Sequence, residues 1–160
     1  MNTTSAQSGT SENPQAPGRL SPTVSPTMIT ERELKQVERA NATAATPVVF
    51  IHGLWLLPSS WEPWAGLFEQ SGYVALTPSW PDDPETVEVA RAKPGVLAKK
   101  TLRQVADHAA EIITALHKKP AVIGHSTGGL LAEMLAGRGL SAATVAIDPG
   151  IGRASFRERV

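Results

Sequence analysis

The sequence has no cysteine, and this absence excludes disulfide bonds, cysteine catalysis and thiolate metal sites. It also lacks an excess of either charge, because Lys and Arg total 15 and Asp and Glu total 15. No electrostatic signal therefore favours nucleic acid or an anionic membrane as a partner. The four histidines do not follow the spacing of a metal site, so we expect no bound metal (His52, His108, His117 and His125).

Long apolar runs are also missing. None approaches the roughly 18–20 residues of a membrane-spanning helix, and the N-terminus lacks the basic and apolar regions of a signal peptide. Hydrophobic residues make up 41% of the 160 residues, enough for one domain with a core of its own. We therefore expect a cytoplasmic protein that binds a small-molecule substrate and neither nucleic acid nor membrane. The oligomeric state is left open.

The composition divides the chain into a tail at residues 1–28, a domain at residues 29–150 and a last segment at residues 151–160, which is treated below. Residues 1–28 are rich in Ser, Thr and Pro and predict a disordered tail, with Met28 as an alternative start. Residues 29–150 carry the pattern of a folded domain, which begins with a capping box at Thr30 and Glu33. The helical spacing of Leu34, Val37 and Ala40 continues that pattern and leaves open whether this short helix is docked or frayed.

Short apolar runs alternate with helical patterns through the rest of the domain. Strands are expected at 47–51, 73–78, 121–124 and 143–147. Helices are expected after Ser59 or Ser60, at 85–92, at 101–116 and after Ser126. This alternation predicts an α/β fold, in which a parallel, doubly wound sheet has flanking helices. Ligands of such sheets bind beyond the carboxyl ends of the strands.

The most informative motif is Gly124-x-Ser126-x-Gly128, placed between a strand and a helix. This spacing is typical of the nucleophile elbow, a strained turn that lifts the serine hydroxyl above the end of the strand. Glycines are needed there because the strand and helix backbones cross so closely that a Cβ would clash. Ser126 is therefore the candidate catalytic nucleophile, and the alternative interpretation is a structural Gly-Ser turn.

A serine nucleophile also needs backbone N–H groups that bind the oxyanion. Thr127 follows the nucleophile directly, and Leu54 lies in the loop after the first strand, so their amides are the candidate donors. Trp55 and Trp80 lie at strand ends, where they either line an apolar pocket or pack. Trp61 and Trp64 fit a buried helix face.

Residues 49–53, the glycine-flanked Ser126 and the strand ending at residues 147–149 together resemble the N-terminal half of the α/β-hydrolase superfamily. More narrowly, the chain is similar to a group of bacterial single-domain serine hydrolases. The resemblance implies a Ser–Asp/Glu–His triad, no metal or organic cofactor and an ester-like or small acyl substrate. It also implies that His52 and Gly53 belong to the oxyanion loop, where His52 supports the loop by hydrogen bonding.

The sequence departs from this family in one respect, since no histidine follows Ser126. Family members carry the acid and then the histidine after the serine. We expect the His125 side chain to point away from the reacting face, and His108 and His117 to lie on the surface. Asp148 fits a turn aspartate before Pro149, and its alternative role is the triad acid.

Residues 151–160 do not continue the hydrolase pattern. All but Phe156 match a translated sequencing adapter, so we interpret this decapeptide as a non-native tail on a hydrolase fragment. The expected function is a serine hydrolase that forms an acyl-enzyme and whose acid and histidine are missing from this chain. The alternatives are a non-catalytic α/β binding module and a cofactor-free haloperoxidase or perhydrolase.

Overall fold

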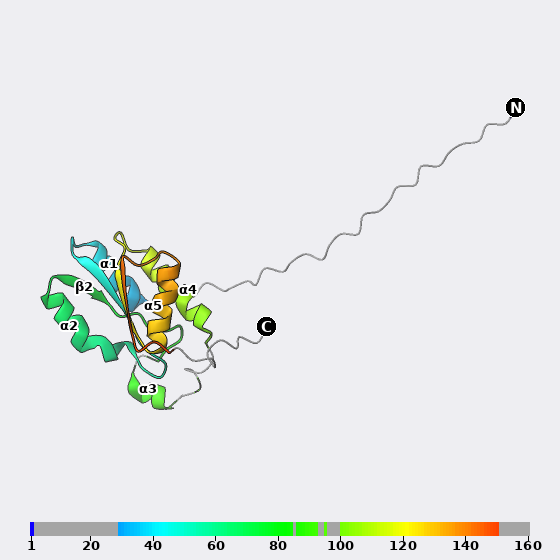
Figure 1. Cartoon of the computed structure of the whole chain (residues 1–160). Helices are drawn as coiled ribbons and strands as arrows, with labels where there is room; N and C mark the ends of the chain where they lie inside the picture. The colour runs from blue at the N-terminus through cyan, green and yellow to red at the C-terminus, as the bar shows by residue number, and fades with distance from the viewer. Residues whose placement is uncertain (2–28, 85, 93–94, 96–99, 151–160) are drawn as a thin grey trace.

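The computed structural model describes Met1 and residues 29–84, 86–92, 95 and 100–150. Four strands form a sheet between helices (Figure 1). In chain order the elements are α1 (Glu31–Asn41), β1 (Thr46–Ile51), the 3-10 helix η1 (Pro58–Trp61), α2 (Glu62–Gln70), β2 (Tyr73–Leu76), α3 (Val87–Ala92), α4 (Leu102–Thr114), β3 (Ala121–His125), α5 (Thr127–Gly137) and β4 (Ala143–Ile147). The predicted α/β fold with a parallel sheet is confirmed.

The strand order is β2-β1-β3-β4, and every pair is parallel. In the central strand β1, Val49 pairs with Leu76 of β2 on one side and with Val122 of β3 on the other. The chain therefore extends the sheet from β1 in one direction and then returns to extend it in the other. This reversal places a topological switch point between β1 and β3, where parallel sheets bind ligands.

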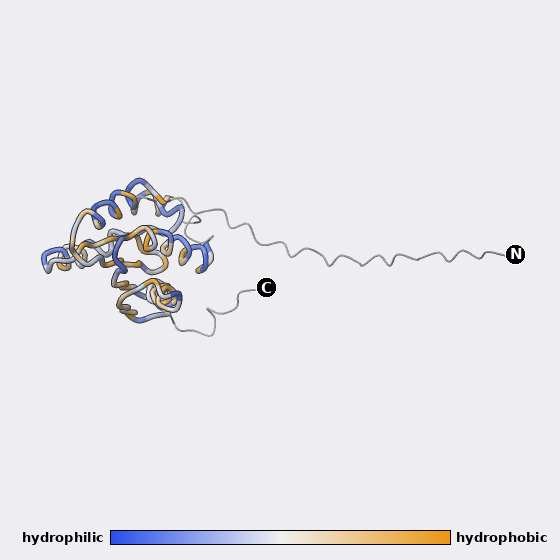
Figure 2. Tube along the Cα trace, turned by 90° about the horizontal axis from the view of Figure 1, so that it is seen from above, coloured by the Kyte–Doolittle hydropathy of each residue, from blue (hydrophilic) through white to orange (hydrophobic). Residues whose placement is uncertain are grey.

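Alternate residues of the strands face two separate helix layers. Val49, Ile51 and Val122 pack in one cluster with residues of α1, α4 and α5. Val48 and Phe50 point to the opposite face and pack with Trp61 and Phe68. Burial on both faces explains why β1 is an unbroken apolar run. In Figure 2 the helices alternate between hydrophilic and hydrophobic residues along the tube, as expected of helices that cover a core on one side.

Helix α1 is docked on the sheet, and its predicted capping box is confirmed, with Thr30 as N-cap and Glu33 at the third helical position. The predicted apolar stripe is wrong at its first position, because Leu34 is 46% exposed and Glu33 takes the buried place. Glu33 can be buried because its Oε1 lies 3.1 Å from Nε2 of His108 in α4. The expectation that His108 lies on the surface is therefore wrong as well.

The region around the second helix also differs from the prediction. Neither Ser59 nor Ser60 caps a helix, because the chain first forms η1, with Leu57 at the N-cap position. Trp61 is buried as expected, but Trp64 is 46% exposed. The two rings meet edge to face at 5.9 Å, so Trp64 lies outside Trp61 rather than in the core.

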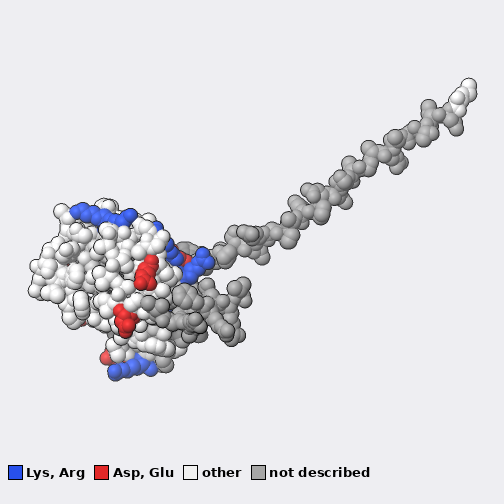
Figure 3. Space-filling view, in the orientation of Figure 1, with Lys and Arg blue, Asp and Glu red and all other residues white. Residues whose placement is uncertain are grey.

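The predictions for residues 2–28 and 151–160 lie outside the described residues. None of the helices within the described ranges is long and apolar enough to cross a membrane. On the face seen in Figure 3, Lys and Arg side chains lie at the upper and lower margins, and Asp and Glu form small separate patches.

Candidate active site

The switch point brings the ends of β1 and β3 side by side. Ile51 pairs with Gly124, so the residues that follow each strand are neighbours at the carboxyl edge of the sheet. From this edge the chain leaves β1 toward α2 on one face and leaves β3 into α5 on the other. Gly53 and Ser126 therefore meet at the edge of the sheet, where the segments that follow two neighbouring parallel strands go to opposite faces.

Ser126 alone separates the end of β3 from the start of α5. Its backbone has φ 55° and ψ −123°, a conformation that residues with a Cβ rarely adopt. Its N–H donates to the Ile147 carbonyl at 2.9 Å, and its own carbonyl accepts from the Gly129 N–H at 2.9 Å. These contacts hold a strained backbone at the apex of a strand–turn–helix unit, which is the geometry of a nucleophile elbow.

The two flanking glycines are required by close backbone contacts. A Cβ on Gly124 would lie 2.0 Å from the Gly128 carbonyl oxygen, and one on Gly128 would lie 2.1 Å from the Ile51 carbonyl oxygen. Such distances are far below van der Waals contact, so any side chain at these positions would force the backbones apart. The tight elbow thus depends on both glycines.

The loop after β1 packs directly against the elbow. A Cβ placed on Gly53 would lie 3.2 Å from the Ser126 Cβ. The loop turns at Leu54 and Trp55, where the Leu56 N–H donates to the Gly53 carbonyl at 3.2 Å and Trp55 has φ 68°. Within the described residues, the Leu54 and Thr127 amides are not engaged in hydrogen bonds, so both remain available to a ligand.

His52 anchors this loop from behind. Its ring is 1% exposed, and its Nδ1 lies 3.0 Å from the Gly53 carbonyl oxygen, while its Nε2 lies 3.3 Å from Oδ2 of Asp83. Asp83 in turn accepts hydrogen bonds from Lys100 Nζ at 2.6 Å and from the Trp80 N–H at 3.1 Å. Asp83 and Lys100 could not be found from the sequence, because nothing in their spacing connects them to His52.

The Asp83 carboxylate is buried and ionised. Burial on its own would raise the pKa of this carboxyl group, but contacts with His52 and Lys100 outweigh that effect and hold the pKa below its ordinary value of 3.8. The side chains of Asp83 and Lys100 are 1% and 6% exposed. A charged pair is therefore enclosed directly behind the candidate oxyanion loop.

A family model described as the alpha/beta hydrolase family matches residues 48–160. The chain belongs to the alpha/beta hydrolase family. No curated protein sequence is significantly similar to it.

Two solved structures resemble this alpha/beta hydrolase chain. One is an extracellular alpha/beta-hydrolase from a Paenibacillus species, described as sharing structural and functional homology with tobacco salicylic acid binding protein 2. It is 20% identical, has a TM-score of 0.47, and the match covers 58% of this chain and 35% of that one. The other is polyneuridine aldehyde esterase, which is 18% identical with a TM-score of 0.48, covering 66% of this chain and 40% of that one. The chain thus spans well under half the length of either structure.

The remaining histidines of this alpha/beta hydrolase chain form no bond with Ser126 among the described residues. His108 is paired with Glu33 between α4 and α1, and His117 is exposed. His125 lies beside the loop after β1, with its Nδ1 3.7 Å from the place of a Gly53 Cβ. Asp148 follows β4 at the same edge of the sheet, exposed and with φ 44°. Its backbone suits a turn, since aspartate tolerates positive φ better than most residues.

The two tryptophans expected at the pocket have different surroundings. Trp80 is 5% exposed, and its ring stacks on the His52 ring with centroids 5.4 Å apart. It therefore packs behind the loop. Trp55 is 59% exposed at the turn beside Leu54 and is free to contact a ligand.

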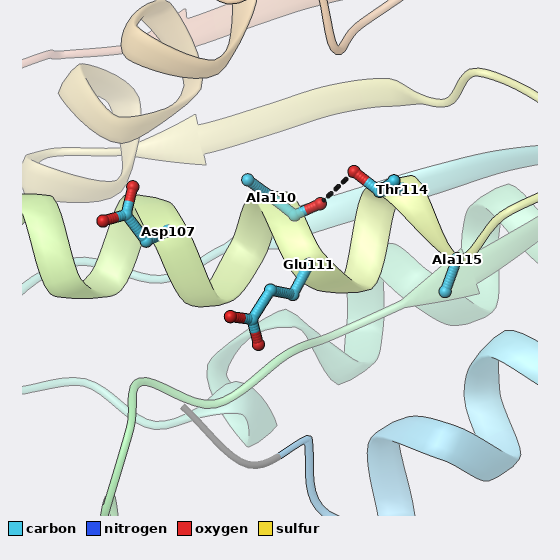
Figure 4. A pocket seen from close by; sticks show the side chains of 5 residues that line it. All are labelled: Asp107, Ala110, Glu111, Thr114 and Ala115. Carbon is cyan, nitrogen blue, oxygen red and sulfur yellow. Dashed lines mark hydrogen bonds between the residues drawn. The ribbon is translucent and has the colours of Figure 1, made fainter. Parts of the chain in front are cut away.

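A hollow on the surface lies along α4, lined by Asp107, Ala110, Glu111, Thr114 and Ala115 (Figure 4). This part of α4 leads into the start of β3, whereas Ser126 follows its end. The hollow is therefore at the opposite edge of the sheet from the elbow. In the portion of the chain that the structure describes, no group of three acidic, histidine or cysteine side chains could hold a metal ion.

Proposed function

We propose that the parent protein is a serine hydrolase acting on an ester-like or small acyl substrate. The observation that carries the proposal is the strained Ser126 at the apex of the elbow, packed against the Gly53 loop. Ser126 Oγ attacks the acyl carbon and its proton passes to a base. The base returns this proton to the leaving oxygen as the ester C–O bond breaks, and water then hydrolyses the resulting acyl-enzyme. A small-molecule substrate and a cytoplasmic location remain predictions from the sequence.

The proposed oxyanion donors are the N–H groups of Leu54 and Thr127. Thr127 begins α5, so its amide carries the positive end of the helix dipole. Leu54 follows Gly53, which lies against Ser126. An oxyanion donor of this kind contributes about 10²–10³ in kcat.

We further propose that this chain is inactive alone because the triad base and acid are missing from it. Support comes from the histidines, since His52 and His108 are buried against carboxylates and no histidine follows Ser126. The chain should give no measurable turnover of p-nitrophenyl acetate. A turnover that disappears in Ser126→Ala would contradict this part of the proposal.

An external base tests the nucleophile separately. The chain is incubated with an alkyl fluorophosphonate, with and without imidazole, and modified peptides are identified by mass spectrometry. In the expected reaction a bond forms from Ser126 Oγ to phosphorus, the P–F bond breaks, fluoride leaves and imidazole takes the proton. Imidazole should accelerate labelling of Ser126 and not of Ser60, whose hydroxyl donates to the Leu57 carbonyl.

Labelling that never reaches Ser126 in the folded chain would refute a nucleophilic role. The alternative of a non-catalytic binding module would then be favoured. A Ser126→Ala chain serves as the matched control, because it removes the hydroxyl and keeps the backbone.

A further inference from the structure

We propose that Asp83 and Lys100 are positioning residues that hold His52 so that its ring fixes the orientation of the Gly53–Leu54 peptide. The proposal rests on the proposed function in one respect, namely that the Leu54 N–H is an oxyanion donor. Its physical basis is the chain of contacts from Lys100 through Asp83 and His52 to the Gly53 carbonyl.

The Gly53–Leu54 peptide links the contact made by His52 to the proposed oxyanion donor. The Gly53 carbonyl and the Leu54 N–H belong to the same planar, trans peptide, so they point in opposite directions. The Gly53 carbonyl is held by two donors, His52 Nδ1 at 3.0 Å and the Leu56 N–H at 3.2 Å. Fixing the carbonyl therefore fixes the direction of the Leu54 N–H.

The contact with the Gly53 carbonyl fixes which nitrogen of His52 carries a hydrogen. A carbonyl oxygen only accepts hydrogen bonds, so Nδ1 must carry the hydrogen. The Asp83 carboxylate lies 3.3 Å from Nε2 and also only accepts, so this contact attracts the ring when Nε2 carries a hydrogen as well, and Trp80 stacks on the ring face. These three contacts together fix the position of the ring and direct Nδ1 at the Gly53 carbonyl oxygen.

The buried ion pair of Asp83 and Lys100 holds the position of the carboxylate that faces His52. Asp83 lies in the loop after β2 and is fixed by the Trp80 N–H and by Lys100, which lies just before α4. Burying an ion pair costs several kcal/mol in desolvation, and apolar residues often fill such a space with no loss of stability. The pair joins the loop after β2 to the segment before α4, and the contact of Asp83 with His52 extends this link to the loop after β1, which carries one of the two proposed oxyanion amides.

The test compares carboxylate-to-amide variants in the full 160-residue chain. Asp83→Asn removes the buried charge, and Asp82→Asn is the matched control, because Asp82 is the exposed neighbour and asparagine tolerates its φ of 58°. Should the single variant fail to fold, Asp83→Asn with Lys100→Met removes both charges and leaves neither buried alone.

The first readout is the imidazole-assisted labelling of Ser126, separated into the maximal rate kinact and the half-saturating concentration KI. A displaced oxyanion donor weakens the transition state and not the initial complex. We expect kinact to fall about tenfold to a hundredfold in the Asp83 variants with KI unchanged, and Asp82→Asn to match the wild type. If Asp83 only stabilised the fold, its substitution would lower the folded fraction, and the folded molecules would keep the wild-type kinact.

The second readout needs no reactivity, since the Leu54 amide resonance in a 15N-labelled chain reports the orientation of the peptide. It should shift in the Asp83 variants and stay in place in Asp82→Asn. A folded Asp83 variant with an unchanged Leu54 resonance and an unchanged kinact overturns the proposal. If the wild type is never labelled at Ser126, the proposed function fails, and the Leu54 resonance alone decides whether Asp83 positions the loop.

Discussion

The backbone crossing at Gly128 gives the sharpest prediction, since Gly128→Ala adds one carbon between α5 and β1. That Cβ would lie 2.1 Å from the Ile51 carbonyl oxygen and 2.7 Å from the His52 carbonyl oxygen, whereas unstrained contacts are about 3.5 Å. Relief requires α5 to move about 1 Å from the sheet, although Leu131 and Leu135 on that helix are fully buried. We expect the free energy of unfolding to fall by about 3 kcal/mol or more.

A Gly→Ala substitution inside α2 should instead raise the free energy of unfolding. Gly66 lies inside α2, and a Cβ there meets no atom within 4 Å. Gly66→Ala should therefore raise the free energy of unfolding by about 0.5–1 kcal/mol through helix propensity. Urea unfolding followed by tryptophan fluorescence measures both, because Trp61 and Trp80 are buried. A Gly128→Ala chain within 1 kcal/mol of the wild type would refute the argument from backbone crossing.

Two further predictions concern the core. Burial would raise the pKa of Glu33, but hydrogen bonds with His108 and Thr30 outweigh burial and lower this pKa from 4.5 to about 2. The ionised Glu33 therefore stabilises the fold above pH 4.5, and this stabilisation is lost as the pH falls toward 2. Glu33→Gln should lower the free energy of unfolding by on the order of 3 kcal/mol at pH 7 and make it depend less on pH below 4.5. If the free energies of the variant and the wild type fall in parallel as the pH is lowered, this prediction is wrong. Trp61→Ala should cost about 3–5 kcal/mol because the ring packs at 5.1 Å on Phe50, whereas Trp64→Ala should cost less than about 1 kcal/mol. Equal shifts in urea midpoint for the two tryptophan variants would show that exposure does not separate them.

Contacts between helices explain why Leu34 is exposed and why Glu33 and His108 are buried. The stripe in α1 left open whether the helix is docked, and the buried Val37 and Ala40 show that it is. The stripe also counted Leu34 among its apolar positions, and Glu33 had only a capping role. Glu33 and His108 are 75 residues apart, and each has a polar side chain expected at the surface. Their mutual contact, together with hydrogen bonds to Glu33 from Thr30 and from the Ser79 N–H, compensates the burial of these polar groups, and no local pattern encodes the contact between the two helices.

The features that the sequence determined by itself are those set by neighbouring residues. The apolar runs, the capping box at Thr30 and the glycine spacing around Ser126 act within a few positions, so the parallel strands, the start of the first helix and the tight elbow could be predicted. Tertiary structure alone decided which loops meet. His52 contacts Asp83, and Asp83 contacts Lys100, because three segments converge at the carboxyl edge of one sheet. The charges of buried residues are satisfied by partners distant in the chain, and such partners exist only once the strands are in order.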